Sequence, residues 1–290
     1  MTKRISARLH FAGEEDFCQI NVHNLVKGFP LHSHDYVEIV IILSGHAEHC
    51  INEKLYSVTS GDVYVLQGNQ EHGFQNTTAD FRVCNVMFRP ELSNFPLEKL
   101  KTMPGYQALF VLEPARRRDR EFRSLLRLDS AHLKEVLEKV TRLRHEMEAR
   151  SPGYDCASQA YLLDMVVYLS RLYSRSSENS TTGLLRFSEA IAWMEENYVR
   201  HSTVMELARK AAMSERHFLR MFRKTFGTTP IEHMINLRIR HAEKMLLSGG
   251  HNITETAYAC GFNDSNYFSR QFRRITGMSP RRYRNISKRT

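Results

Sequence analysis

Between residues 18 and 90, short runs rich in apolar residues recur along the chain, which predicts β-strands. The clearest run is VEIVIIL at 37–43, and the others lie at 47–51, 54–58, 62–66 and 81–88. Gly or Asn stands at most of the joints between the runs. Strands this short, repeating about every ten residues, predict an antiparallel barrel or a double sheet.

Two helices are predicted after the strands, within residues 131–173. The first has one apolar stripe, made of Leu133, Val136, Leu137, Val140, Leu143 and Met147. The second, residues 161–169, is apolar nearly all round and should be buried. Two such helices beside a barrel either cover it or pair two chains, and we favour a homodimer interface. The run Arg116–Arg120 before them is interpreted as a solvated loop.

Residues 174–183 (SRSSENSTTG) are small, polar and aperiodic, which is typical of a linker. We place the linker at 175–183, between an N-terminal domain of residues 1–174 and a C-terminal domain of residues 184–290. Helical periodicity predicts that the C-terminal domain is all-α. Its predicted helices lie at about 184–199, 203–211, 214–226, 230–247, 253–260, 264–275 and 280–286.

Charge separates the two domains as clearly as hydropathy does. Residues 184–290 hold 19 Lys and Arg against 9 Asp and Glu, whereas residues 1–183 hold 22 against 23. The C-terminal domain therefore carries the whole excess of +9. A compact basic domain beside a neutral one indicates a polyanionic partner, and we expect double-stranded DNA.

Composition excludes several other classes of protein. Of the 290 residues, 42% are hydrophobic and 25% are charged, as in ordinary globular proteins. No apolar run reaches the roughly 18 residues of a membrane helix, and the N-terminus lacks the apolar core of a signal peptide. The five cysteines are scattered without a CxxC pair. We therefore expect a cytoplasmic protein without a membrane partner, without disulfides and without a thiolate zinc site.

The basic domain contains an internal repeat. FLRMFRK at 218–224 returns as FSRQFRR at 268–274, and Gly227 and Pro230 return as Gly277 and Pro280 at the same offset. Each copy follows a short helix and a tight turn, the sequence pattern of a helix-turn-helix, whose second helix enters the DNA major groove. Each longer helix also has an apolar face of Phe residues and a polar face. The polar faces carry Arg216, Arg220 and Arg223 in the first copy and Asn266, Arg270 and Arg273 in the second.

Residues 253–284, ITETAYACGFNDSNYFSRQFRRITGMSPRRYR, closely resemble the signature of the AraC/XylS family of bacterial transcription regulators. The resemblance covers 184–290 and implies seven helices with two helix-turn-helix units. By alignment it implies that the base-facing positions are Glu215, Arg216, Arg220, Asp264, Ser265, Asn266 and Arg270. Two residues depart from the family pattern: Ala212 replaces a common turn Gly, and Thr256 replaces an aliphatic residue. Each should cost a little stability.

The N-terminal domain carries a second motif, His32-x-His34-x-x-x-Glu38 followed by Gly45, Gly61 and His72. Its spacing is similar to the two cupin motifs, which implies a cupin-like β-barrel. In metal-binding cupins the matching residues surround one divalent ion, but AraC-like regulators commonly keep such a remnant in a sensor barrel without metal. We therefore predict no metal, no cofactor and no catalytic residue. The predicted effector-binding residues are His32, His34, Glu38, Tyr64 and His72.

The sequence as a whole predicts a two-domain α+β protein, a cupin-like barrel with two helices joined to an all-α domain with two helix-turn-helix units. We predict a sequence-specific transcription regulator, and not an enzyme, that activates genes in response to a small effector such as a sugar. Its overall pattern is similar to the regulators of carbohydrate catabolism genes. Its expected partners are DNA, the effector, a second copy of the chain and RNA polymerase. The alternative is a metal-dependent cupin enzyme or a metal sensor fused to a DNA-binding module.

Overall fold

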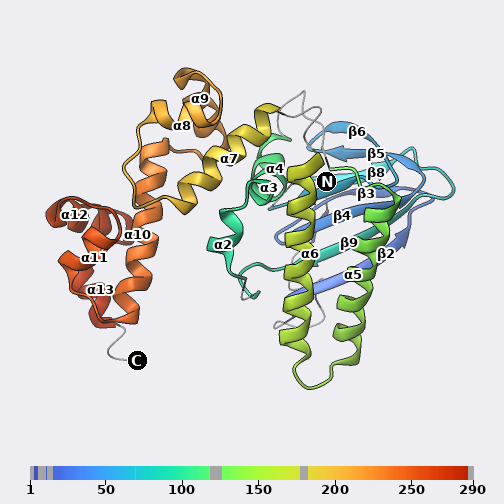
Figure 1. The fold of residues 1–290 in the computed structure, drawn as a ribbon. Coiled ribbons are helices and arrows are strands. Elements are labelled where there is room, and N and C mark those ends of the chain that lie inside the picture. The colour runs from blue at the N-terminus through green and yellow to red at the C-terminus, as the bar shows by residue number, and fades with distance from the viewer. Residues whose placement is uncertain are drawn as a thin grey trace. The chain divides into compact units, whose positions relative to one another are not determined.

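The fold is that of a computed structural model, which describes residues 3–5, 11, 16–68, 70–93, 95–117, 126–176 and 182–286. The chain forms two compact units, Met1–Leu185 and Arg186–Thr290 (Figure 1). Each unit is described separately below. In the described residues, no helix is both long and apolar enough to cross a membrane.

The first unit is built on two β-sheets. In chain order the strands are β1 (Lys3–Ile5), β2 (Cys18–Asn24), β3 (Phe29–His34), β4 (Val37–Ser44), β5 (His46–Ile51), β6 (Lys54–Thr59), β7 (Val63–Leu66), β8 (His72–Gln75) and β9 (Arg82–Phe88). One sheet has the order β1-β3-β8-β5-β6 and the other β2-β9-β4-β7. Only β1 and β3 pair in parallel among the described strands. The predicted double sheet is therefore confirmed.

The two sheets share one apolar core, because strands from both contribute to it. Val40, Ile42, Leu66 and Val83 come from one sheet, and Ala47, Ile51, Val58 and Phe74 from the other. In β5 the inward positions alternate with outward ones, as a strand with one buried face requires. By contrast, β4 is buried on both faces over most of its length. The sheet that contains β4 is thus covered on its second face as well.

Helices follow the last strand: α2 (Leu97–Lys101), α3 (Pro104–Tyr106), the π-helix η1 (Gln107–Leu112), α4 (Glu113–Arg116), α5 (Ser130–Ala149) and α6 (Tyr154–Ser176). The two long helices α5 and α6 match the predicted pair and lie side by side as a hairpin (Figure 1). Helix α5 also contacts β2, while α6 contacts α3. Most of their apolar residues are therefore used inside this unit. The short helices α2 to α4 have no clear periodicity and were not predicted.

Our interpretation of Arg116–Arg120 as a solvated loop is wrong for Arg117, whose exposed fraction is 0%. The Arg117 guanidinium forms an ion pair with Glu113, at 3.1 Å, and donates to the Val65 carbonyl of β7. A run of arginines resembles a solvated segment, and only tertiary contacts reveal that one of them points inward. Residues 118–120 lie outside the described part of the chain.

The second unit is helical, as predicted. Its helices are α7 (Thr182–Glu196), α8 (Val204–Lys210), α9 (Glu215–Phe226), α10 (Pro230–Ser248), α11 (Ile253–Ala259), α12 (Ser265–Thr276) and α13 (Pro280–Ile286). Thr203, Thr229 and Asn252 form capping boxes at the starts of α8, α10 and α11. Gly227 and Gly277 end α9 and α12 in the left-handed conformation. The described helices thus begin and end close to the predicted positions.

The internal repeat is confirmed at the two turns. The Met213 amide donates to the Ala208 carbonyl at 2.9 Å, and the Phe262 amide donates to the Ala257 carbonyl at 3.0 Å. The residue before each of these amides is left-handed, with φ of 50° at Ala212 and 83° at Gly261. The two helix-turn-helix units therefore share one backbone geometry although only the second has glycine there.

The predicted linker lies largely outside the described residues, because 177–181 are not described. Helix α6 extends to Ser176 and α7 begins at Thr182. The domain limits of 174 and 184 therefore remain a prediction.

Candidate functional site

Helices α9 and α12 are strongly amphipathic and divide into the faces that the repeat predicted. On the apolar side, Phe218 and Phe222 of α9 and Phe268 and Phe272 of α12 are fully buried. On the polar side, the predicted base-facing residues Glu215, Arg216, Arg220, Asp264, Asn266 and Arg270 are exposed, and Ser265 is half-buried. Each unit therefore presents polar side chains on its second helix, including Arg216 and Arg220 on α9 and Arg270 on α12, which suits DNA binding.

Asp264 has a structural task that the sequence did not indicate. It is the N-cap of α12, and its carboxylate accepts hydrogen bonds from the amides of Asn266, at 2.9 Å, and Tyr267, at 3.1 Å. Ser214 holds the same position before α9 and accepts from the His217 amide. The Asp264 carboxylate is thus engaged at the start of the helix that would enter the major groove.

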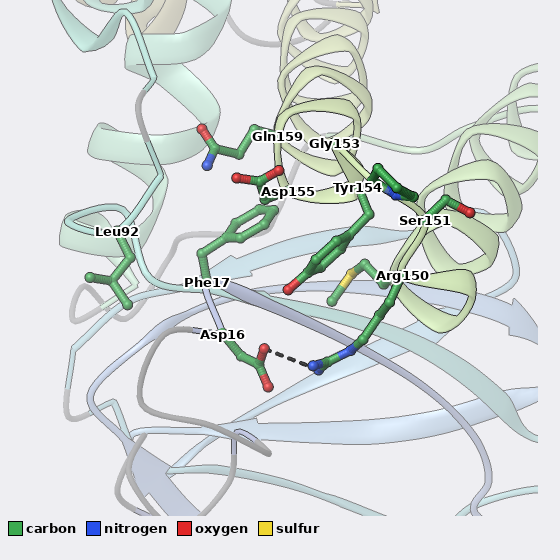
Figure 2. A pocket seen from close by; sticks show the side chains of 11 residues that line it. Asp16, Phe17, Leu92, Arg150, Ser151, Gly153, Tyr154, Asp155 and Gln159 are labelled. Carbon is green, nitrogen blue, oxygen red and sulfur yellow. Dashed lines mark hydrogen bonds and ion pairs between the residues drawn. The ribbon is translucent and has the colours of Figure 1, made fainter.

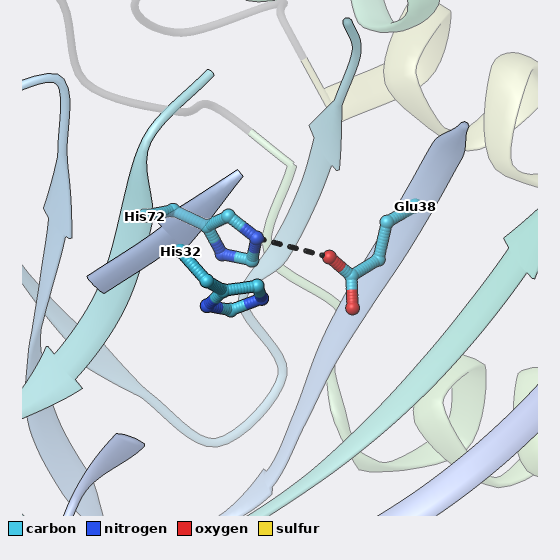
Figure 3. Close-up of side chains that lie close together, drawn as sticks. All are labelled: His32, Glu38 and His72. Atoms are coloured by element: carbon cyan, nitrogen blue, oxygen red, sulfur yellow. Dashed lines mark ion pairs between the residues drawn. The ribbon is translucent and has the colours of Figure 1, made fainter. Parts of the chain in front are cut away.

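In the first unit, the structure brings the predicted effector residues together between the two sheets. His32 and His34 lie on β3, Glu38 lies on β4, and His72 lies on β8 directly opposite His32. Their exposed fractions are 7%, 2%, 2% and 1% in chain order. The His32 and His72 rings lie 4.1 Å apart, with Glu38 facing them from the other sheet (Figure 3). The spacing of the motif was therefore sufficient to find this cluster.

Backbone carbonyls fix which ring nitrogens carry protons. His32 Nδ1 lies 3.1 Å from the Pro30 carbonyl, and His34 Nδ1 lies 3.0 Å from the Tyr36 carbonyl. Because a carbonyl oxygen only accepts, both Nδ1 atoms must donate. In the neutral form, both rings then carry a lone pair on Nε2, which in His34 is directed at Glu38.

The lone pair on His34 Nε2 faces two other hydrogen-bond acceptors. His34 Nε2 lies 2.9 Å from Glu38 Oε2 and 3.1 Å from His72 Nε2, and the His72–Glu38 distance is 3.3 Å. A single hydrogen from His72 satisfies only one of these contacts, so the cluster needs an additional proton or a cation. His32, Glu38 and His72 also offer ligand atoms within 4.8 Å of one another. Imidazole and carboxylate donors fit a divalent transition metal, and the Pro30 carbonyl holds Nδ1 of His32 so that its Nε2 is free to bind.

The sequence analysis missed His49, which is fully buried on β5. Its ring stacks on Phe74 at 4.2 Å and meets Tyr64 edge-on at 5.1 Å. In the described structure, both His49 nitrogens and His72 Nδ1 have no hydrogen-bond partner. The strict alternation of Ala47, His49 and Ile51 could have identified His49 as inward-facing.

Burial controls the protonation of these histidines. It holds the pKa of His49 and of His72 well below the usual 6.5, and the Arg117 charge lowers both further. The pKa of His32 is also lowered, mainly by burial. Burial raises the pKa of the Tyr64 phenol, whose ring contacts His49. At neutral pH, His49, His72 and Tyr64 therefore offer uncharged hydrogen-bonding groups.

Comparison with known proteins adds independent information on both units. A helix-turn-helix domain family matches residues 207–286, and the AraC-like ligand binding domain family matches residues 16–150. The HTH-type transcriptional activator RhaS of Salmonella arizonae is 30% identical over 256 residues, covering 87% of this chain and 86% of that protein. RhaS of Salmonella typhimurium strain LT2 matches to the same extent. The chain belongs to the AraC family.

As an AraC-family member, this protein is a DNA-binding transcriptional regulator with a ligand-binding domain, similar to the activator RhaS. Its relatives are regulators and not enzymes. The predicted family, two-domain fold and regulatory function are thus confirmed.

Two solved structures are also similar. The DNA-binding domain of AdpA in complex with a target DNA is 34% identical, with a TM-score of 0.34, and the match covers 35% of this chain and 91% of that one. ToxT of Vibrio cholerae with a bound unsaturated fatty acid is 15% identical, with a TM-score of 0.34, and the match covers 92% and 95%.

A different cavity of this regulator lies beside the turn between α5 and α6 and has a volume of about 480 Å³. Figure 2 shows the Asp16–Arg150 ion pair, at 3.3 Å, at one side of it, with the rings of Phe17 and Tyr154 nearby. None of the predicted effector residues lines this cavity. It is therefore separate from the histidine cluster.

Proposed function

We propose that this AraC-family regulator activates transcription when a small polyhydroxylated effector, such as a sugar, binds between the two sheets. The effector would contact the predicted residues His32, His34, Glu38, Tyr64 and His72, together with His49. The observation that carries this proposal is the set of buried ring nitrogens of His49 and His72 without a partner in the described structure. A buried polar group without a partner is costly, so such groups indicate a ligand.

The chemistry of these groups favours hydroxyls. A neutral imidazole offers one donor and one acceptor, and a hydroxyl group can pair with both. The stacked Phe74 and the edge of Tyr64 add apolar surface beside the polar groups. Such a mixture of a few polar groups on an apolar wall is typical of small-molecule sites.

On DNA, we propose that Glu215, Arg216, Arg220, Asp264, Ser265, Asn266 and Arg270 form the base-facing surface of the two recognition helices. Their exposure on α9 and α12 and the basic charge of the unit support this. Asp264 would act in part through the cap that fixes the first turn of α12. We further propose that the protein acts in the cytoplasm as a homodimer and contacts RNA polymerase at promoters. Light scattering of the full chain tests the dimer, and a single-chain mass would refute it.

The alternative function is metal sensing, or metal-dependent catalysis, by the same cluster. The convergence of His34 Nε2, His72 Nε2 and Glu38 Oε2 within 3.3 Å favours it, because a divalent cation would satisfy all three lone pairs. His32, His34, Glu38 and His72 would hold the ion, which would act as a Lewis acid when bound.

A thermal-shift screen of the full chain separates the two functions. The panel contains L-rhamnose, L-arabinose, D-galactose and D-glucuronate, each with and without a chelator. A ligand at 100 times its Kd adds about 2.7 kcal/mol to the stability of the domain that binds it. A shift from one sugar that the chelator does not abolish supports the sugar sensor. No shift from any sugar, with a melting temperature that the chelator lowers, supports the metal site instead.

A matched pair of variants locates the ligand. His49→Phe keeps a ring on Phe74 but removes both nitrogens, so we expect the sugar-dependent shift to disappear. His46→Phe lies on the same strand with an outward side chain and should keep the full shift. Retention of the shift in His49→Phe would place the ligand elsewhere in the protein.

A further inference from the structure

Arg117, Glu113 and Tyr173 form a buried polar relay that links the barrel to the end of α6. Arg117 donates to Glu113 Oε2 at 3.1 Å, and the Tyr173 hydroxyl donates to Glu113 Oε1 at 2.9 Å. Arg117 also donates to the Val65 carbonyl of β7. All three relay side chains have exposed fractions of 0%. The relay therefore joins β7, α4 and α6 without contact with solvent.

On its other side, the relay touches the proposed effector pocket. The Arg117 guanidinium lies 5.3 Å from the centre of the Tyr64 ring, and that ring lies 5.1 Å from His49. His49 in turn lies 5.8 Å from His72. Tyr64 thus stands between the histidines and the relay, and any movement of its ring changes the surroundings of Arg117.

The far end of the relay lies close to the DNA-binding unit in the sequence. Tyr173 is in the last turn of α6, which ends at Ser176, and α7 begins at Thr182. The hydroxyl of Tyr173 therefore fixes the final turn of the helix from which the chain continues to the DNA-binding unit.

The composition of the relay is hard to explain by stability alone. Buried ion pairs are often no more stabilising than apolar residues of the same volume, because both charges lose their hydration. The hydrogen bonding of the Arg117–Glu113 ion pair is also incomplete, since Arg117 Nε is buried without a partner in the described structure. A buried donor without a partner is costly, so an arrangement of the guanidinium that satisfied Arg117 Nε would compete with the described one, as a two-state element requires.

We propose that this relay transmits effector binding to the DNA-binding unit. An effector that contacts His49 and Tyr64 shifts the Tyr64 ring, and the Arg117 guanidinium follows it. Glu113 then changes its hydrogen bond to Tyr173, which reorients the last turn of α6. The inference rests on the proposed effector pocket, but the relay can be tested without any effector.

The test variant is Tyr173→Phe, which keeps the ring and removes only the hydroxyl. The matched control is Tyr168→Phe on the same helix, whose hydroxyl donates to Glu135 on the protein surface at 2.5 Å. Circular dichroism spectra that match that of the natural chain establish that both variants fold; Tyr173→Phe should melt at a lower temperature, because the buried Glu113 carboxylate loses one hydrogen bond. The two hydroxyls donate to Glu113 and Glu135, which belong neither to the proposed effector residues nor to the DNA-facing residues, so binding of each ligand alone should stay within about twofold.

The first measurement needs no effector. Hydrogen–deuterium exchange of a peptide from the last turns of α6 is compared in the full chain, with and without the pocket substitution His49→Leu. We expect His49→Leu to change exchange in this peptide, Tyr173→Phe to abolish that change, and Tyr168→Phe to preserve it. An unchanged peptide in His49→Leu, or an undiminished change in Tyr173→Phe, would overturn the relay.

The second measurement uses the sugar from the panel that shifts the melting temperature and a duplex that the protein selects from a random pool. Coupling of two sites typically changes affinity about 5- to 150-fold. We expect the sugar to change DNA affinity at least fivefold in the natural chain and in Tyr168→Phe, but less than twofold in Tyr173→Phe. Equal coupling in all three proteins would overturn the relay. Failure of every sugar to bind would refute the effector proposal, and the exchange measurement would still decide on the relay.

Discussion

Gly261 closes the turn of the second helix-turn-helix unit, and we predict that Gly261→Ala strongly destabilises the DNA-binding unit. An added Cβ would lie 2.4 Å from the Val199 carbonyl oxygen and 2.8 Å from Val199 Cα, both backbone atoms. The Val199 segment is fixed in place, because Arg238 donates from Nε to the neighbouring Tyr198 carbonyl at 2.7 Å. The clash can therefore be relieved only by moving helices apart.

The magnitude follows from three contributions. Placing a non-glycine residue at the left-handed φ of 83° costs about 1–2 kcal/mol. Forcing an extra methyl group into packed backbone costs about 1–3 kcal/mol. Alanine restricts the unfolded chain, which returns about 0.4–1 kcal/mol. We therefore expect a net loss of about 1–5 kcal/mol in the free energy of unfolding.

The first repeat provides the matched control, because Ala212 occupies the same position with a φ of 50°. Ala212→Gly removes the left-handed penalty of about 1–2 kcal/mol and adds backbone entropy worth about 0.5–1 kcal/mol. We expect this variant to be as stable as the natural chain or more stable, by up to about 1.5 kcal/mol. The two substitutions should thus have opposite signs.

Urea unfolding of the full chain, followed by tryptophan fluorescence, measures both effects. Trp193 is the only tryptophan and lies on α7, so the signal reports on the DNA-binding unit. Equal stability of Gly261→Ala and the natural chain would refute the reasoning. So would a loss of more than 1 kcal/mol in Ala212→Gly, since the two turns would then not share the described geometry.

Three further predictions concern DNA and pH. Arg270→Ala should cost about 1–3 kcal/mol of binding on the selected duplex and relax specificity at one base, and an equal loss on scrambled DNA would indicate a phosphate contact instead. If each chain neutralises about 6 phosphates, log K measured by fluorescence anisotropy should fall against log salt with a slope near −5, and a slope near zero would exclude ionic binding. Because the pKa values of His49 and His72 lie below 6.5 in the folded protein, the unfolded chain binds more protons as the pH falls. The stability that these residues contribute is therefore present above about pH 6.5 and is lost as the pH falls. Melting experiments between about pH 7 and pH 5.5 should show a loss of about 1 kcal/mol for each histidine, and a smaller total loss in His49→Phe. A melting temperature that does not change with pH would contradict the burial argument.

The helix-turn-helix repeat and the strands β4, β5, β6, β7 and β9 were predictable because their signals are local, whereas β1, β2, β3 and β8 were not predicted. A helix face repeats every three to four residues and a strand face every two, so Phe218 and Phe268 could be assigned to buried faces from the sequence alone. His32, His34 and Glu38 also lie close together in the sequence, so the spacing of this motif identified three members of the buried cluster. The stop signals Gly227 and Gly277 likewise act within one helix end.

Other features depend on which segments the fold brings together. His49 lies beside His72 and Phe74 because β5 pairs with β8, and Arg117 becomes buried because a short helix without periodicity packs between β7 and α6. The family resemblance implies that Asp264 faces bases, whereas the structure shows that its carboxylate caps α12. The sequence by itself determined the family, the helices of the second unit, five of the described strands and the basic charge, since these rest on periodicity, motifs and composition. Only the tertiary structure decided which polar side chains are buried together, because burial depends on contacts between residues far apart in the chain.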